Sequence, residues 1–574
     1  MELAEYTINN QKDYILEELY KRKPDVLCFS CYIWNIDYVT DIAREYKKLC
    51  PSVPIWVGGP EVSYEVEAFL RENPYIDGVM IGEGEDTFRE LCGYYAHKRK
   101  LSDIAGIAFR KNSTGNSTSV NNIGGNKAGE IVFTSPRPIK NMSEIPFCYD
   151  TLDDFSNRII YYESSRGCPF SCSYCLSSVD KTLRFRDTEI VKRELKFFID
   201  QKVPQIKFVD RTFNCNHAHA MELWRFIKAN DNGVTNFHFE ISADLLNQEE
   251  LELISDMRPG LIQLEIGVQS TNEVTIKEIH RTMKLERLKE VVRLIQSGNN
   301  IHEHLDLIAG LPYEDYDSFG RSFDEIYELK PNQLQLGFLK VLKGSYMFEH
   351  AAEYGIVYHD KPPYEVMSTK WLSFDDVIKI KRVEEMLEVY YNSGQFEITM
   401  KLMECIFDSS FEFFQELGDF YEANGYFGMS HSRIRRCEIL LEFLALYLHG
   451  CDSDDMASVG LSGNAGDRDN TDFDENAQIY SMIQESLIFD LYYRENCKSR
   501  PRWATDIGKF KHMTHAYCKN GKLSHVEPFH YIFPDKHTRK LDELPKYHKE
   551  PVWALFHYDM RDPLDHQALV EYIE

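Results

Sequence analysis

Three cysteines close together are the residues most able to carry chemistry in this sequence. Cys168, Cys172 and Cys175 lie in the run SRGCPFSCSYC (165–175). Thiolates at this spacing on a short Gly/Pro/Ser loop can turn toward one centre, which favours an iron–sulfur cluster or zinc. Structural zinc and electron-transfer clusters use four protein ligands, and the loop holds no fourth cysteine or histidine. The spacing therefore predicts a 4Fe–4S cluster with one iron open to a small molecule.

Two other interpretations of these cysteines remain open. Zinc would be bound if Cys215 or a histidine such as His217 supplied a fourth ligand. The three thiols could also be buried side chains that share a loop by chance. The density of cysteines in so short a segment favours the cluster over both.

The loop, with Tyr174 directly before its last cysteine, resembles the C-x3-C-x2-C signature of the radical S-adenosylmethionine (radical SAM) superfamily. The resemblance extends over residues 158–345. In that family, the open iron binds the amino and carboxylate groups of SAM. One electron then cleaves SAM into methionine and a 5′-deoxyadenosyl radical, which abstracts hydrogen from the substrate. The resemblance implies that the three cysteines hold the cluster and that backbone around Tyr174 faces adenine.

Two later segments carry polar residues at the ends of predicted strands. Glu240 and Ser242 are two residues apart, so both point to one face, into the predicted barrel. By resemblance, they contact the ribose or methionyl group of SAM. Asp210, Arg211 and Asn214 crowd another strand end. An internal Asp–Arg ion pair and a substrate or cofactor contact are equally favoured there.

Two further strands resemble SAM-contacting segments of the family. Glu265, Gln269 and Ser270 in LEIGVQS resemble a fourth-strand motif near SAM. Ile308 and Gly310 in LDLIAGLP resemble the fifth-strand segment whose backbone passes adenine. Taken singly, each is equally explained as an ordinary strand end.

A repeated strand–helix pattern must position these loops. Helix-length segments, with 191–201 and 285–296 the clearest, separate the predicted strands. Consecutive βα units predict a parallel sheet closed into a barrel or partial barrel, with its chemistry at the strand C-terminal ends. We expect an α/β partial (βα)6 radical SAM barrel over 158–345, with strands at 158–165, 205–213, 236–245, 261–270, 304–312 and 333–342.

The first hundred residues show a shorter version of this alternation. Predicted strands end in Gly58-Gly59-Pro60 and Gly82-Glu83-Gly84, and open α/β sheets bind ligands at such ends. Residues 1–100 resemble the Rossmann-like domain of cobalamin-binding radical SAM proteins. The expected strands are 3–9, 26–32, 54–59 and 77–84, and the expected helices are 10–22 and 36–49.

This segment departs from the cobalamin-binding pattern in two ways. It lacks the Asp-x-His-x-x-Gly motif that supplies a histidine to cobalt in many cobalamin proteins, and it opens at what resembles the domain's second strand. We therefore expect that cobalamin, if bound, is held weakly and without a protein ligand to cobalt.

The rest of the chain connects and extends these domains. Residues 101–157 predict a hairpin (106–110 and 130–135) and a linker. Residues 350–574 predict a mainly helical C-terminal domain that resembles an uncharacterised domain of some family members, with Ser373 and Asp376 as a capping box. The acidic loop 451–476 fails the calcium-loop pattern and predicts a solvated loop.

Composition limits the partners. The 574 residues hold 65 Lys and Arg against 92 Asp and Glu, a net charge of −27 that disfavours nucleic acid. No run of about 18 apolar residues predicts a membrane span. The start of the sequence has neither a basic nor an apolar leader segment, and 14 cysteines are too sparse for a disulfide scaffold. These features predict a cytoplasmic protein.

We expect a radical SAM enzyme with a 4Fe–4S cluster, SAM and possible cobalamin. Methyl transfer through cobalamin is the first reaction to consider, on an unknown small-molecule or peptide substrate, with flavodoxin or ferredoxin as electron donor. The main alternative is a non-catalytic or decayed iron–sulfur scaffold. An RNA-modifying enzyme is disfavoured by the charge.

Overall fold

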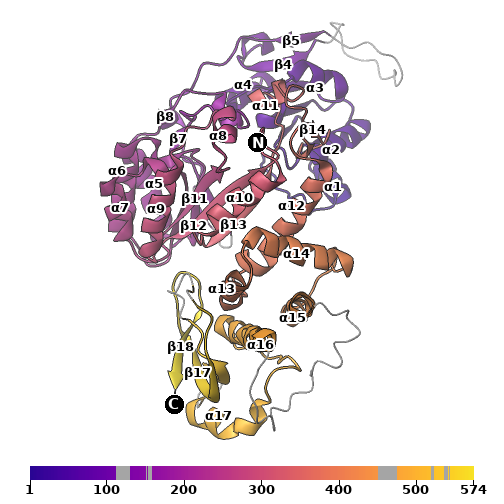
Figure 1. Ribbon diagram of the computed structural model, residues 1–574. Helices are drawn as coiled ribbons and strands as arrows, with labels where there is room; N and C mark the ends of the chain where they lie inside the picture. The colour runs from indigo at the N-terminus through magenta and orange to yellow at the C-terminus, as the bar shows by residue number, and fades with distance from the viewer. Residues whose placement is uncertain are drawn as a thin grey trace.

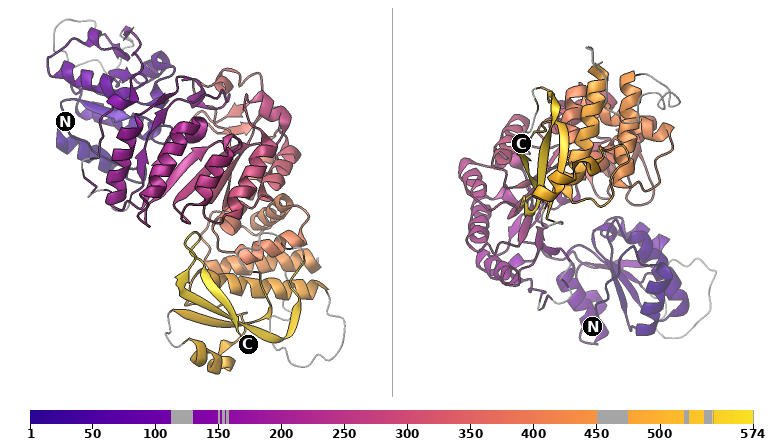
Figure 2. Two further views of the ribbon diagram at one scale, coloured as in Figure 1. Left: turned by 90° about the vertical axis from the view of Figure 1, so that its left-hand side faces the viewer. Right: turned by 90° about the horizontal axis from the view of Figure 1, so that it is seen from below.

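A computed structural model describes residues 1–111, 130–149, 151–152, 155, 158–449, 475–518, 523–534, 541 and 543–573. The connection at 112–129 and the acidic loop at 451–474 lie outside the described residues. An N-terminal α/β part, a central parallel sheet with its helices and a C-terminal part follow one another along the molecule (Figures 1 and 2).

The N-terminal part is a five-stranded sheet of order β1-β2-β3-β4-β5 among the described residues. The first three strands are parallel, and β4 and β5 continue the sheet antiparallel. This confirms the predicted α/β class. The strands are β1 (Leu27–Ser30), β2 (Ile55–Gly58), β3 (Gly78–Met80), β4 (Ile107–Arg110) and β5 (Ile131–Phe133), with helices α1 (Lys12–Arg22), α2 (Ile36–Leu49), α3 (Val66–Glu72) and α4 (Gly84–Tyr95).

The strand predicted at 3–9 was wrong. These residues form no strand and precede α1 as irregular chain. Leu3 and Ile8, two of the apolar residues that suggested a strand, are exposed. An apolar and aromatic segment forms a strand only where a partner strand covers it.

The central sheet has six described strands in the order β13-β12-β11-β10-β9-β6, and all its pairs are parallel. This confirms the predicted parallel sheet, open between its edge strands β6 and β13. The strands are β6 (Ile160–Tyr162), β9 (Gln205–Phe208), β10 (Asn236–Ile241), β11 (Ile262–Gln269), β12 (His302–Ala309) and β13 (Gln333–Phe338). Figure 1 shows helices on its outer side: α5 (Thr188–Asp200), α6 (His217–Ala229), α7 (Gln248–Ser255), α9 (Leu285–Ser297) and α10 (Tyr316–Tyr327).

Short polar caps start all of these helices except α9, and apolar stripes fix them to the sheet. The Asp187 carboxylate accepts hydrogen bonds from the backbone of Glu189 and Ile190, at 3.0 and 3.3 Å, and satisfies donors that the first turn of α5 leaves free. Buried Val191 and Leu195 then repeat at helical spacing along the same helix.

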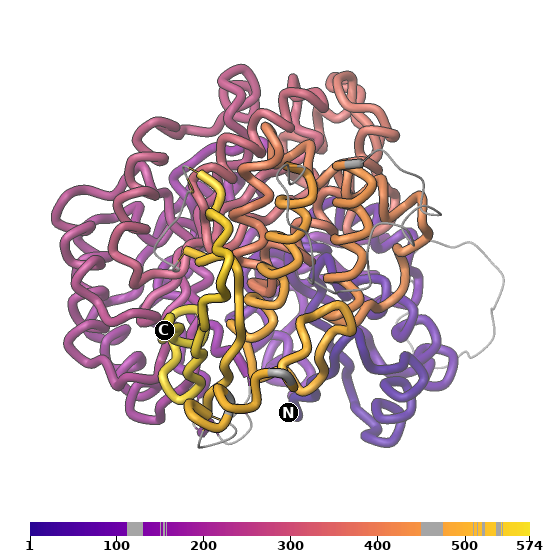
Figure 3. Tube along the Cα trace, turned by 60° about the horizontal axis from the view of Figure 1, so that its bottom comes forward, coloured from indigo at the N-terminus to yellow at the C-terminus, as the bar shows by residue number. Residues whose placement is uncertain are grey.

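The C-terminal part confirms the helical prediction and adds a sheet that was not predicted. Its helices are α12 (Phe374–Leu387), α13 (Glu397–Ile406), α14 (Ser410–Ala423), α15 (Arg433–His449), α16 (Glu475–Arg494) and α17 (Lys511–Tyr517). The antiparallel sheet β16-β17-β18 follows, with β16 (Ser524–Tyr531), β17 (Tyr547–Arg561) and β18 (Ala568–Ile573), and Figure 3 shows it in yellow at the C-terminal end. Phe489 of α16 packs on this sheet, with ring centroids 5.6 Å from Phe529 and 5.1 Å from Phe556.

Two separate apolar cores divide the molecule. One core is continuous from the central sheet through the C-terminal helices to the last sheet, and the N-terminal part has a core of its own. The predicted capping box at Ser373 is present, with both reciprocal contacts to Asp376. Across the described ranges, no helix is both long enough and apolar enough to cross a membrane.

Candidate functional site

The cysteine loop follows the short strand β7 (Ser165–Arg166) and is fixed by backbone contacts. Gly167 has φ of 92°, and a Cβ at this position would lie 2.6 Å from the Thr182 carbonyl oxygen, so only glycine fits. The Ser173 amide donates to the Ile279 carbonyl, and the Ser173 carbonyl accepts from the Met347 amide, both at 2.9 Å. The loop is therefore tied to two other segments of the barrel mouth.

All three cysteines of the loop face one cavity of about 180 Å³ at the C-terminal ends of the central strands. Cys168 and Cys172 are buried and Cys175 is partly buried. The cavity is lined by most of the residues that the sequence singled out: Cys168, Cys172, Tyr174, Cys175, Arg211, Glu240, Ser242, Glu265 and Gln269.

Three of the residues singled out on β11 and β12 do not line this cavity. Ile308 packs against a small apolar cluster beside it. Gly310 has φ of 89°, and a Cβ there would lie 2.7 Å from the Val366 side chain. The Ser270 hydroxyl donates to the buried Glu314 carboxylate at 2.6 Å, which makes it part of the support behind the strand end.

The crowded strand end at 210–214 divides into three roles. Asp210 is fully buried and accepts from the backbone and the hydroxyl of Ser164, at 2.9 and 2.6 Å. Arg211 instead lines the cavity. The Asn214 amide exchanges two hydrogen bonds with the backbone of Ser242, at 3.0 and 2.8 Å. The internal Asp–Arg pair that the sequence left open is not the arrangement found.

Arg281 is a cavity residue that the sequence analysis missed. It lies between α8 (Glu273–Glu278) and α9. Its guanidinium donates to the Tyr174 hydroxyl at 3.1 Å and to the Gly267 carbonyl, and one nitrogen lies 3.9 Å from the Cys172 sulfur. Burial raises the pKa of the Cys172 thiol, and the positive charge of Arg281 beside it acts in the opposite direction.

The carboxylates of the cavity have opposite environments. Burial alone would raise the pKa of Glu265, but contacts from His238 Nε2 (3.0 Å) and Lys207 Nζ (2.9 Å) lower it to about 2. Burial and the neighbouring Glu265 charge raise the pKa of Glu240 to about 7. Glu265 is thus an anion at neutral pH, whereas Glu240 titrates near neutral pH.

Thr212 and Asp306 are two further cavity residues without a role in the sequence analysis. The Thr212 hydroxyl lies 3.8 Å from the Cys168 sulfur. Asp306 lies on β12, 3.1 Å from His304 Nε2, and burial raises its pKa. A carboxylate within the otherwise apolar second half of β12, residues 305–309, was a signal that could have identified Asp306.

Within the described ranges, no three His, Cys, Asp or Glu side chains surround a single metal-ion position. A 4Fe–4S cluster poses a different requirement, because its cysteines bind to separate irons across a larger group. The observation that bears on a cluster is that three thiols line one cavity.

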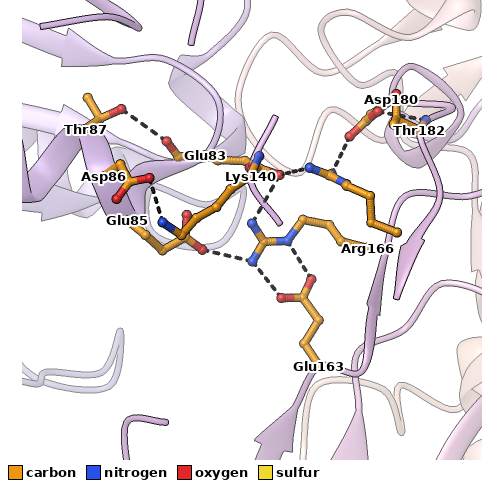
Figure 4. A network of polar contacts seen from close by, with 10 residues as sticks. Glu83, Glu85, Asp86, Thr87, Lys140, Glu163, Arg166, Asp180 and Thr182 are labelled. Atoms are coloured by element: carbon orange, nitrogen blue, oxygen red, sulfur yellow. Dashed lines mark hydrogen bonds and ion pairs between the residues drawn. The ribbon is translucent and has the colours of Figure 1, made fainter. Parts of the chain in front are cut away.

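The carboxyl-terminal ends of the parallel strands in the N-terminal sheet face this cavity region. Open α/β sheets bind ligands at such ends, so we call this side of the sheet its ligand edge. Glu83 and Glu85, in the loop after β3 and the start of α4, contact Arg166 and Arg184 of the cysteine-loop region (Figure 4). The loop after β2 makes a second contact, in which the Tyr364 hydroxyl donates to Glu61. Two loops from one edge of the first sheet therefore dock on the mouth of the second.

Replacing Arg281 by methionine should destabilise the cavity, because the Gly267 carbonyl and the Tyr174 hydroxyl would lose their donor. We expect the barrel's melting temperature to fall by about 5 °C, as for a loss of roughly 2 kcal/mol. Calorimetry would measure it, with exposed Arg225→Met on α6 as the control. Equal melting of the two variants would contradict the supporting role of Arg281.

Comparison with known families divides the chain into three matched segments. Residues 2–92 match the B12 binding domain, residues 162–326 match the radical SAM superfamily, and residues 352–567 match a family described as a protein of unknown function, DUF4080.

Curated relatives share part of the chain. The cobalamin-dependent radical SAM methyltransferase TokK of Streptomyces tokunonensis is 27% identical over 329 residues, which cover 53% of this chain and 45% of TokK. An uncharacterized methyltransferase of Pyrococcus horikoshii is 24% identical over 371 residues, which cover 63% of this chain and 75% of that protein. The chain thus spans less than half the length of TokK.

The fold is also similar to a solved structure. The cobalamin-dependent S-adenosylmethionine radical enzyme OxsB, with aqua-cobalamin and S-adenosylmethionine bound, aligns with a TM-score of 0.50 and 15% identity, over 84% of this chain and 73% of OxsB. The chain therefore combines three segments that match, in order, a B12 binding domain, the radical SAM superfamily and DUF4080.

Proposed function

We propose that this protein is a cobalamin-dependent radical SAM methyltransferase acting on a small molecule or peptide. One observation carries the proposal: three thiols and the polar ends of β10 and β11 line a single cavity, and the ligand edge of the B12-binding domain docks beside it. Methyl transfer through cobalamin needs SAM and cobalamin side by side, and this arrangement supports that.

The donor set fits a 4Fe–4S cluster. Cys168, Cys172 and Cys175 supply three thiolates, which leaves one iron for SAM. Arg281 beside Cys172 offsets the negative charge that thiolates and cluster bring into a partly buried site. When bound, a cluster of this kind supplies the electron that cleaves SAM.

The polar lining fits SAM, whose donors and positive sulfonium need buried acceptors. Gln269 Oε1 is buried without a hydrogen-bond partner among the described residues, and Glu240 and Ser242 lie beside it in the same cavity. We assign Glu240 and Gln269 to the ribose and methionyl parts, Glu265 to the charge balance of the cavity, and backbone near Tyr174 to adenine. A backbone role of Ile308 and Gly310 toward adenine stays a prediction from the family.

The edge of the first sheet fits a flat ligand without a histidine ligand. Gly59 has φ of 116°, and a Cβ there would lie 2.4 Å from the Cys31 carbonyl, so the loop packs as close as backbone allows. Tyr32 and Trp34, exposed and stacked at 4.6 Å, follow β1 at the same edge. His97 is the one histidine in residues 1–100, and it follows the far end of α4.

Several features of the setting belong to the same proposal. We assign residues 1–100, 101–157, 158–345 and 350–574 to the cobalamin domain, linker, radical SAM barrel and C-terminal domain. The described cysteines form no disulfide, which fits the reducing cytoplasm. A flavodoxin or ferredoxin is the proposed source of the electron.

Reconstituted without oxygen, the protein should bind about four irons and four sulfides per chain. Replacing Cys168, Cys172 and Cys175 by alanine should abolish the iron-dependent absorbance and leave the helical circular dichroism unchanged, because a loop and no core is altered. Cys405→Ala, at an exposed cysteine of α13, is the control. Zinc in place of iron would contradict the assignment. Cluster without release of 5′-deoxyadenosine from SAM would favour the scaffold alternative.

Glu240 should control SAM binding more than cluster content. Because its raised pKa of about 7 keeps the carboxyl partly protonated at neutral pH, the affinity for SAM should rise between pH 6 and 8 as the anion forms. Glu240→Gln should remove this pH dependence and weaken binding by about tenfold, the loss of one charge-assisted hydrogen bond. Calorimetric titration of the cluster-loaded protein measures both effects. Exposed Glu290→Gln on α9 should retain the wild-type profile, and a profile unchanged in Glu240→Gln would remove Glu240 from the SAM site.

Cobalamin should bind without a protein ligand to cobalt. We expect sub-stoichiometric cobalamin after purification, and an electron paramagnetic resonance spectrum of cob(II)alamin without nitrogen hyperfine splitting from histidine. His97→Ala should change neither result. Splitting that disappears in His97→Ala would overturn this prediction.

A further inference from the structure

Two arginines face each other at the base of the cysteine loop. The strand β8 (Arg184–Phe185) pairs antiparallel with β7, and Arg166 stands directly opposite Arg184 in this register. Like charges directly opposite in a β-pair repel each other. Carboxylates beside the two guanidinium groups therefore stabilise this short ladder, and one of them, Asp180 of the barrel, lies 2.9 Å from Arg184.

The anion shared by both arginines comes from the B12-binding domain. Glu83 Oε1 lies 2.6 Å from Arg184 Nη1 and 3.3 Å from Arg166 Nη1. Glu85 Oε1 lies 2.9 Å from Arg166 Nη2. On the barrel side, Glu163 holds the other edge of Arg166 through contacts of 2.7 and 3.0 Å. Figure 4 shows these groups converging from the two domains.

The contacts are partly buried, so solvent screens them less than surface pairs. The side chains of Arg184 and Glu83 are 11% and 21% exposed. Burial lowers the pKa of Arg166, but the contacts with Glu163 and Glu85 raise it by more. The net pKa is therefore above its usual value, and the guanidinium stays charged. The Glu83 side chain makes no cap hydrogen bond to α4; its Oε1 contacts the two arginines, and its Oε2 accepts from the Lys140 amide at 3.2 Å.

These ion pairs lie next to both the cysteine loop and the glycine-rich loop of the first sheet. Arg166 is two residues before Cys168, and Glu83 lies within the glycine-rich loop at the ligand edge of the first sheet. The two domains have separate apolar cores, so contacts between loops, and no shared core, hold one domain against the other.

We infer that Arg166 and Arg184 anchor the Gly82–Glu85 loop of the B12-binding domain to the cysteine loop, and that Arg166 is a positioning residue that couples the two cofactor loops. The coupling of loops rests on the contacts alone, and the statement that each loop serves a cofactor rests on the proposed function. The anchor acts through backbone placement and does not itself touch the reacting atoms.

Hydrogen exchange across the domain boundary tests the coupling on the full-length protein with its cluster reconstituted. Glu83→Gln keeps the side-chain shape and should speed exchange of amides in residues 165–176, in the other domain, by about tenfold, the loss of one charge-assisted hydrogen bond. Arg166→Gln should speed exchange reciprocally in residues 83–90. Glu67→Gln, which removes an exposed carboxylate of α3 in the same domain, is the matched control and should change neither segment.

Faster exchange confined to the substituted domain would overturn the inference. If Arg166→Gln loses its iron, Glu83→Gln still decides, because that substitution lies outside the barrel. With added hydroxocobalamin reduced to cob(II)alamin, pulsed electron paramagnetic resonance should show a broader distance distribution between cobalt and the reduced cluster in Glu83→Gln than in Glu67→Gln. Absence of bound cobalamin would count against the proposed function. The hydrogen-exchange result would then still test whether Arg166 and Arg184 anchor the loop.

Discussion

The structure depends on holding three thiols around one cavity with a loop that has no helix or strand of its own. Such a segment gains little from regular hydrogen bonding, so its shape must come from neighbours. Gly167 packs against the Thr182 backbone, and Ser173 exchanges backbone hydrogen bonds with Ile279 and Met347. The strand ends of the central sheet converge around it, which explains why the lining comes from several distant parts of the sequence.

Charge is the second constraint on this cavity. The three cysteines, Glu265 and Asp306 bring groups that can carry negative charge into a partly buried space, where uncompensated charges are costly. Arg281 and Arg211 supply positive charge at the cavity wall, and Lys207 does so behind Glu265. The same compensation lowers the pKa of Glu265 and leaves Glu240, which lacks such a partner, with a raised pKa. Glu240 and Glu265 thus differ in protonation although both are glutamates, because their surroundings differ.

Features that depend on local sequence patterns were predicted, and features that depend on contacts between distant residues were missed. The cysteine spacing, the strand–helix alternation and the capping box at Ser373 are local, and the structure has them in those places. Arg281 contacts Cys172 from 109 positions away, with no motif around it. The last sheet was missed partly because Pro528 interrupts the pattern of β16, which is tolerated since β16 is an edge strand.

The two kinds of domain contact divide the site into a rigid and an adjustable side. The barrel and the C-terminal helices share one apolar core, and such cores are close-packed and resist small displacements. The B12-binding domain has a core of its own, meets the barrel through ion pairs, and contacts Tyr364 of the C-terminal domain through Glu61. Polar interfaces of this kind permit relative domain motion. The B12-binding side can therefore adjust to a large ligand such as cobalamin, while the barrel, which lines the cavity, keeps its shape.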